Sequence, residues 1–271
     1  MLYPMLRTLL ISFFDVDSAV ATNTPFVGLG NYIQVFADPT FWGSIGRTLY
    51  FTVVSTGTEL IFGFVLALLL NAKLKARWLF RAVIVLPWAI PTVVNAAMWR
   101  GVFDAQYGPL NALLTQTGLL DQYRAWLADP GFALNAVIIA DVWKTTPIVA
   151  FFLLTGLTSI PGEVYEAARI DRAGWLRIGR SIVLPMLVPA ISIVLVLRTV
   201  DAFKVFDVIY VMTRGGPVNS TQTIAYYAFN TAFSNQQFGL GSALSYIIVL
   251  IIFAITTFYL RLLRRSETSL L

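Results

Sequence analysis

The sequence has no cysteine and no histidine among its 271 residues, and only 12% of its residues are charged. Without thiols or imidazoles it cannot form a disulfide, a Cys/His metal site, a thiol nucleophile or an imidazole base. Soluble domains carry about 25% charged residues, whereas this chain is 58% hydrophobic with a mean hydropathy of +0.75. Much enzyme chemistry is therefore excluded, and we expect neither a catalytic residue nor a metal site.

The positive charge of the chain does not indicate nucleic acid as a partner. The net charge is +5, but the Lys and Arg residues stand beside apolar blocks instead of forming one basic face. These blocks are long enough to cross a hydrocarbon core of roughly 30 Å. We therefore expect an all-α polytopic membrane protein, with residues 1–271 forming a single transmembrane domain in contact with lipid.

Six apolar blocks are candidates for membrane spans. Residues 1–14 would reach only about 21 Å at about 1.5 Å per helical residue, so we expect a first helix that is truncated. In the third block, Pro87 and Pro91 predict a kinked helix. The expected spans are 1–14 (partial), 48–71, 82–103, 133–157, 182–206 and 240–262.

The basic residues next to these blocks predict their orientation, because Lys and Arg in short loops favour the cytoplasmic side. Segments 72–81, 158–181 and 261–271 contain eleven Lys or Arg residues, whereas the alternate loops contain only Arg47 and two others. We therefore expect both the N terminus and the C terminus to lie in the cytoplasm.

Segment 158–181, which lies between two expected spans, is the most informative part of the chain. Pro161 suits the first turn of a helix, and Glu163 suits a helix N-terminus. Gly174 then offers a turn before the next apolar block. We predict a short interfacial helix, a bend and a second helix, with small alanine side chains that would let another protein approach closely.

Here the sequence resembles the permeases of binding-protein-dependent ABC importers. Their signature is Glu-Ala-Ala, a Gly after three more residues, then nine residues and Ile-x-Leu-Pro. The matching residues are Glu166, Ala167, Ala168, Ile182, Leu184 and Pro185. The expected Gly is Arg172, which would cost about 1 kcal/mol or more at positive φ. Either the turn has moved to Gly174 or the backbone at 172 is helical; we expect the turn at Gly174.

The resemblance implies a type I importer core of six helices in a bacterial or archaeal cytoplasmic membrane. It implies a second permease subunit, two ATPase subunits and an extracytoplasmic sugar-binding protein. This chain has no Walker A pattern, so it is expected to bind no cofactor, and ATP and Mg would be bound by the ATPase subunits. The resemblance assigns ATPase coupling to residues 158–181, hereafter the coupling segment. The residues expected to take part are Glu166, Ala167, Ala168, Asp171, Arg172 and Gly174.

Other stretches resemble the sugar-importing branch of this family, namely 26–32, 86–87, 141–147 and 213–217. Stretch 141–147, together with 198–203, is most similar to the trehalose and maltose permeases. The implied function is ATP-driven import of a disaccharide such as trehalose or maltose by alternating access. The alternative is an ion-coupled secondary transporter, which would predict inverted repeats with broken helices in both halves.

Charged residues within the expected spans are costly and usually mark a pathway or a structural pair. Asp141 and Lys144 can meet on one helix face, and the charged residues from Arg198 to Asp207 alternate in sign every third position. One interpretation is a self-neutralised ladder that stiffens the bundle. The other is contact with sugar hydroxyls, with aromatic side chains covering the sugar rings or serving only as interfacial anchors. The pathway candidates are Tyr50, Trp88, Asn95, Trp99, Asp141, Trp143, Lys144, Arg198, Asp201 and Lys204.

Overall fold

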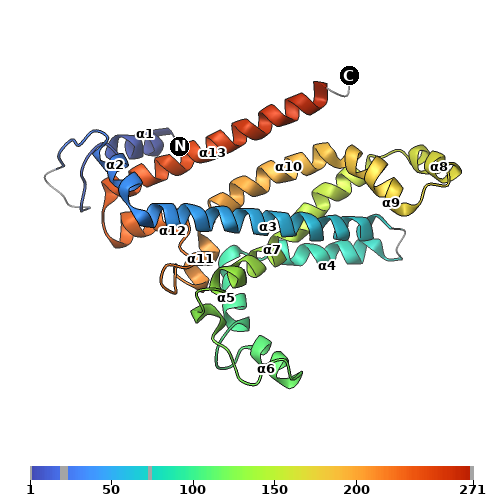
Figure 1. Ribbon diagram of the computed structural model, residues 1–271, viewed down its shortest axis with the longest axis horizontal. Coiled ribbons are helices and arrows are strands. Elements are labelled where there is room, and N and C mark those ends of the chain that lie inside the picture. Colours follow the sequence, from blue (N-terminus) through green and yellow to red (C-terminus); the bar gives the residue numbers. More distant parts are fainter. Residues whose placement is uncertain (1, 19–23, 73–74, 269–271) are drawn as a thin grey trace.

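The computed structural model describes residues 2–18, 24–72 and 75–268, and within these ranges the chain is built from helices (Figure 1). The first helices are α1 (Leu2–Ile11), α2 (Gly30–Ala37), α3 (Pro39–Asn71), α4 (Arg77–Ala89), α5 (Thr92–Val102) and α6 (Pro109–Gln116). After the 3-10 turn η1 (Trp126–Ala128) come α7 (Ala133–Thr158), α8 (Gly162–Ile170), α9 (Trp175–Ile178), the π-helical η2 (Gly179–Val183) and α10 (Leu184–Phe203). The chain continues with α11 (Asp207–Met212), α12 (Ile224–Phe229), the π-helical η3 (Asn230–Ser234) and α13 (Phe238–Thr268). The predicted all-α fold is confirmed.

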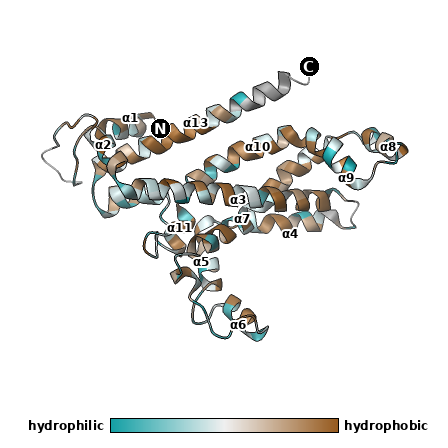
Figure 2. Ribbon diagram, viewed as in Figure 1, coloured by the Kyte–Doolittle hydropathy of each residue, from teal (hydrophilic) through white to brown (hydrophobic). Residues whose placement is uncertain are grey.

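Four helices are long and apolar enough to cross a membrane, namely α3, α7, the continuous run Trp175–Phe203 and Phe238–Tyr259 within α13. Figure 2 shows hydrophobic residues along α3, α4 and α10, and hydrophilic residues among the apolar ones of α8 and α9. Helix α3 begins earlier than the block expected at 48–71. The Asp38 carboxylate accepts a hydrogen bond from the Thr40 N–H at 2.7 Å, and Pro39 occupies the first turn.

Helices α4 and α5 form a broken pair instead of one kinked helix. They meet at an angle of 90° across Ile90 and Pro91. Pro91 has no N–H to continue the helix of α4, and Ile90 is extended, as residues before proline usually are. The block expected at 82–103 therefore changes direction halfway along.

Helices α3, α7 and α10 pack against one another and build the core next to the coupling segment. Leu70, Leu153 and Leu187, one from each helix, are almost fully buried. Where α3 meets α7, a Cβ atom on Gly63 would lie 2.6 Å from Val149 Cγ1. Glycine therefore lets the two backbones approach closely, as small residues do between membrane helices.

The two ends of the long helices are built differently (Figure 1). The coupling segment lies at one end, and α1, α2 and α12 lie toward the other. A separate lobe, residues 104–132, follows α5 and contains α6. The buried Asn111 amide holds this lobe together, since Nδ2 donates to the carbonyls of Asp104 and Arg124 and Oδ1 accepts from Trp126 Nε1. The backbone N–H groups of residues 106 and 107 also hold the pKa of Asp104 below its usual range.

Candidate functional site

The long helices bring two carboxylates and one guanidinium together in the interior. Glu59 of α3 is fully buried, and its Oε2 accepts from Arg198 Nε of α10 at 2.6 Å while Oε1 accepts from Nη2 at 2.9 Å. Arg198 Nη2 also donates to Asp141 Oδ2 of α7 at 3.2 Å, and the Thr145 hydroxyl donates to Glu59 Oε1 at 2.6 Å. We call these four residues the buried charge cluster. They connect three helices through charge-assisted hydrogen bonds.

A polar pocket of about 310 Å³ lies beside this cluster, between the α4–α5 break, α7, α10 and the start of α11. Its lining includes six of the ten pathway candidates, together with residues that were not among the candidates. The six candidates are Trp88, Asp141, Lys144, Arg198, Asp201 and Lys204. The main additional polar residues are Thr92, Thr145 and Asp207. Six candidates from separate stretches of the sequence thus lie together around one pocket.

The break between α4 and α5 supplies one polar group to this pocket. The chain bends by 90° just after Trp88, and the Trp88 carbonyl accepts a hydrogen bond from Lys144 Nζ at 3.4 Å. Asp201, which also lines the pocket, pairs with Lys204 at 3.0 Å and lies 4.0 Å from Arg198 Nη1. The pocket is therefore lined by charges of both signs.

Two expected pairings are wrong. Asp141 and Lys144 form no ion pair within 4.0 Å in the described part of the chain, because Asp141 pairs with Arg198 and Lys144 with a carbonyl. The alternating ladder also stops at Lys204. Helix α10 ends there, and Asp207 begins α11 in a new direction, so these two side chains form no ion pair among the described residues.

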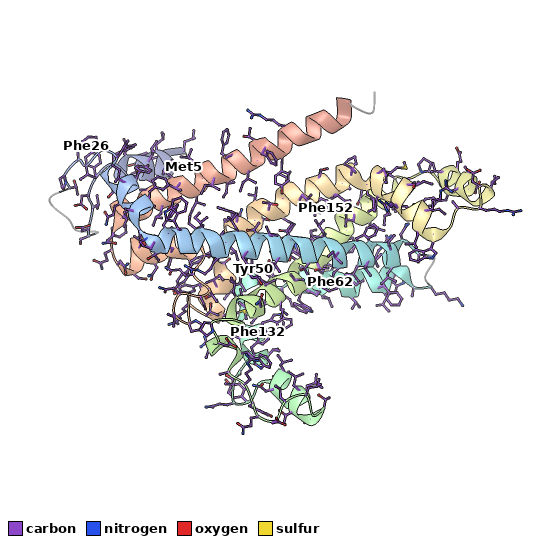
Figure 3. All side chains as sticks on the ribbon, in the orientation of Figure 1. Met5, Phe26, Tyr50, Phe62, Phe132 and Phe152 are labelled. Carbon is purple, nitrogen blue, oxygen red and sulfur yellow. The ribbon has the colours of Figure 1, made fainter. Side chains whose placement is uncertain are left out.

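Four other pathway candidates lie outside the polar pocket. Trp99 and Trp143 pack edge to face with ring centroids 5.9 Å apart and line a separate, mainly apolar cavity of about 650 Å³. Asn95 is fully buried and donates to the Ala140 carbonyl at 3.1 Å. Tyr50, labelled on α3 in Figure 3, donates to Asn135 Oδ1 at 2.8 Å. Their helices turn these side chains toward other faces.

Glu59 was not among the predicted site residues, although the sequence contains a signal for it. Glu59 is the one charged residue in the apolar stretch 48–71. A carboxylate in such a stretch needs a partner, because an isolated buried charge is very costly. The partner, Arg198, lies 139 positions away, so the sequence alone did not reveal it.

The coupling segment contains an amphipathic helix, α8. Val164 and Tyr165 pack against the core, and Ala168 is only 6% exposed. Glu166 and Ala167 lie on the opposite face and are exposed, as the period of 3.6 residues requires. Burial raises the pKa of Tyr165 above its usual range. Ala167, but not Ala168, therefore offers a small side chain at the outer surface.

The bend after α8 is not where we expected it. Arg172 has the left-handed backbone, with φ of 51°, whereas Gly174 is extended, with φ of −67° and ψ of 159°. The Ala173 N–H donates to the Ala168 carbonyl at 3.0 Å, which is the long hydrogen bond of a Schellman cap. Arg172 thus occupies the position of that cap where glycine is usual, and the expectation of a turn at Gly174 is wrong.

The outer surface of the coupling segment combines charge with exposed apolar area. Ile170 and Trp175 are 82% and 81% exposed. A hollow of about 650 Å³ lies in the same part of the chain and includes Ala167, Asp171 and Arg177 in its lining. Exposed apolar residues gathered in this way are typical of a surface that contacts another protein.

Comparison with known proteins identifies a family. Residues 59–270 match the model of the binding-protein-dependent transport system inner membrane component. The chain is 41% identical over 258 residues to the trehalose/maltose transport system permease protein MalF of Thermococcus litoralis, covering 95% of this chain and 86% of that protein. It is 34% identical to the sulfoquinovosyl glycerol transport system permease protein SmoG of Agrobacterium fabrum, covering 98% and 85%. It is also 36% identical to the trehalose transport system permease protein SugA of Mycobacterium tuberculosis, covering 91% and 78%.

Solved structures show the same fold. A chain from the crystal structure of a bacterial ABC transporter that imports the acidic polysaccharide alginate superposes with a TM-score of 0.84. The two chains are 22% identical, and the match covers 98% of this chain and 90% of that one. A chain of the methionine ABC transporter MetNI, in an inward-facing conformation, gives a TM-score of 0.60 at 16% identity, covering 85% and 99%.

Proposed function

The chain belongs to the family of binding-protein-dependent transport system inner membrane components, and we propose that it forms part of the translocation pathway of an ATP-driven sugar importer. Members of this family are transport subunits and not enzymes, and the chain is a multi-pass membrane protein. The proposed cargo is a disaccharide such as trehalose or maltose. The proposed partners are a second permease, two ATPase subunits that bind ATP and Mg, and an extracytoplasmic sugar-binding protein.

The polar pocket carries this proposal. It lies between long apolar helices, and its lining includes Asp141, Lys144 and Asp201, which supply hydrogen-bond donors and acceptors. Sugar hydroxyls both donate and accept, so a lining with both signs of charge suits them. Trp88 adds an aromatic side chain that can cover an apolar ring face.

In the proposed mechanism, the outer face of α8 receives the ATPase subunit. Ala167 allows close approach, and Glu166 and Asp171 supply charges on exposed positions. Movement of α8 would reach the pocket through the continuous helical run Trp175–Phe203, which carries Arg198 and Asp201 at its far end. Alternating access would then follow from closure and release of the ATPase pair.

The decisive experiment is uptake of radiolabelled trehalose and maltose by the full complex in liposomes. We expect uptake that requires ATP, and we expect Ala167→Arg to abolish it while the complex still assembles. The matched control is Ala105→Arg, which places the same side chain at an exposed alanine of the lobe 104–132. Uptake driven by an ion gradient without the ATPase would overturn the proposal in favour of a secondary transporter, which no comparison supports.

The proposed orientation places the coupling segment in the cytoplasm and the lobe 104–132 on the outer side. It can be tested with single cysteines, because the chain contains none of its own. A single cysteine at Tyr107 or at Glu163, both exposed, would be the only thiol in the chain. In intact cells, a membrane-impermeant maleimide should label Tyr107→Cys at once and Glu163→Cys only after permeabilisation. The reverse order would show that the coupling segment lies outside, contrary to the proposal.

A further inference from the structure

Glu59 lies behind the polar pocket and does not line it. Its carboxylate accepts two hydrogen bonds from Arg198 and one from Thr145, and both of these residues do line the pocket. Glu59 itself is fully buried on α3. This bidentate contact fixes the plane of the Arg198 guanidinium, because Nε and Nη2 each donate to a different oxygen of the Glu59 carboxylate.

Arg198 has other partners available on the pocket side. Its Nη2 reaches Asp141 at 3.2 Å, and its Nη1 is 4.0 Å from Asp201, a half-exposed carboxylate that already holds Lys204 at 3.0 Å. If Glu59 released the guanidinium, Arg198 would be drawn toward these carboxylates. The donors presented to the pocket would then change direction without any change in the pocket-lining residues.

We infer that Glu59 is a positioning residue that orients Arg198 and thereby determines how the pocket discriminates between sugars. This inference rests on the proposed function, because it takes the polar pocket as the sugar pathway. Trehalose and maltose are both disaccharides of glucose but differ in their linkage, so one ring of each presents hydroxyls at different positions and in different directions. A guanidinium has five donors in a rigid fork, and its orientation therefore favours one arrangement of hydroxyls over another.

The test is the ratio of trehalose to maltose uptake by the full complex in liposomes, normalised to the amount of folded complex. We expect Glu59→Gln to change this ratio by about threefold or more, a size typical of coupled neighbours. Arg198→Lys should change it in the same direction, and the double variant should change it no further, because both substitutions remove one interaction. Thr56→Val is the matched control, since Thr56 is buried on the same helix but its hydroxyl has no hydrogen-bond partner among the described residues.

The outcomes separate this inference from the proposed function. A lower melting temperature with an unchanged ratio would show that Glu59 only stabilises the fold. If Asp201→Asn or Lys144→Gln changes the ratio and Glu59→Gln does not, the pocket is the pathway but the inference is wrong. If the unsubstituted complex takes up neither sugar with ATP, the proposed function fails first. If the Glu59→Gln complex does not assemble, Glu59→Asp takes its place. This variant keeps the charge but moves the carboxylate away from Arg198 by one methylene, and it should likewise change the ratio of trehalose to maltose uptake.

Discussion

The buried charge cluster and the coupling segment use charged side chains in opposite ways. In the cluster, Glu59 is fully buried and its hydrogen bonds all go to side chains of two other helices. In the coupling segment, Glu163 and Glu166 are exposed and form no ion pair within the described residues, and Trp175 of the same segment is also exposed. The cluster therefore joins the helices of one chain, whereas the coupling segment presents charge and apolar area outward.

This difference predicts where substitutions will damage the fold and where they will damage only assembly with partners. A buried charge that loses its partner has neither water nor another group to replace it. An exposed charge that loses its partner is solvated and screened by salt. Charge substitutions in the cluster should therefore affect the stability of the chain, and those on the outer face of α8 should affect coupling.

The largest expected effect is that of Arg198→Met. It leaves Glu59 and Asp141 as buried carboxylates without a cation, and we expect a loss of about 3–5 kcal/mol in the free energy of unfolding. The measurement is thermal unfolding of the purified complex in detergent, followed by tryptophan fluorescence.

The control for this prediction is Arg124→Met in the lobe 104–132. Arg124 pairs with Asp129, and the two side chains are 50% and 30% exposed, so we expect a loss of no more than about 1 kcal/mol. Equal losses in the two variants would break the distinction between the cluster and the exposed charges.

The next effect concerns the close contact of α3 and α7 that brings Glu59 near Thr145. In Gly63→Ala, the new Cβ would lie 2.6 Å from Val149 Cγ1 and 3.2 Å from the Ala150 nitrogen, so the helices must separate. We expect a loss of about 1–3 kcal/mol, as in other overpacked interiors. Gly57→Ala on the same helix meets no atom within 4 Å and should be nearly neutral in the same unfolding measurement. A neutral Gly63→Ala would show that the cluster does not depend on this contact.

The two regions also differ in how far the sequence could predict them. The helix, bend and second helix predicted for the coupling segment are present, because their signals lie together, from Pro161 just before α8 to Pro185 in α10. Hydropathy likewise predicted the all-α fold. The cluster was only partly predicted, because its contacts join residues 57 and 139 positions apart. Spacing along one helix suggested Asp141 with Lys144, but the carboxylate instead meets a guanidinium from another helix.

The conformation at residue 172 is the one detail of the coupling segment that residue type predicted wrongly. Arginine disfavours positive φ, so the turn was expected at Gly174. The structure keeps the cap geometry at residue 172, because the Ala173 N–H bonds to the Ala168 carbonyl in the Schellman pattern. The hydrogen bond that ends α8 therefore prevailed over the preference of one side chain.

The smallest effect we predict follows from this strain. Arg172→Gly should stabilise the coupling segment by about 1 kcal/mol, because a left-handed residue with a Cβ costs about that much. Hydrogen exchange should slow at Asp171 and Ala173, whose N–H groups bond to carbonyls of α8, and not in the buried charge cluster.

Arg172→Ala separates the two roles of this residue, since it removes the guanidinium but keeps the strain. If coupling to the ATPase falls in Arg172→Ala and in Arg172→Gly alike, the side chain is a contact; if only the glycine variant alters exchange, the backbone carries the effect. Faster exchange in Arg172→Gly would contradict the assignment of strain. It would mean that arginine stabilises this cap by limiting the freedom of the backbone, and that this effect is larger than the cost of its positive φ.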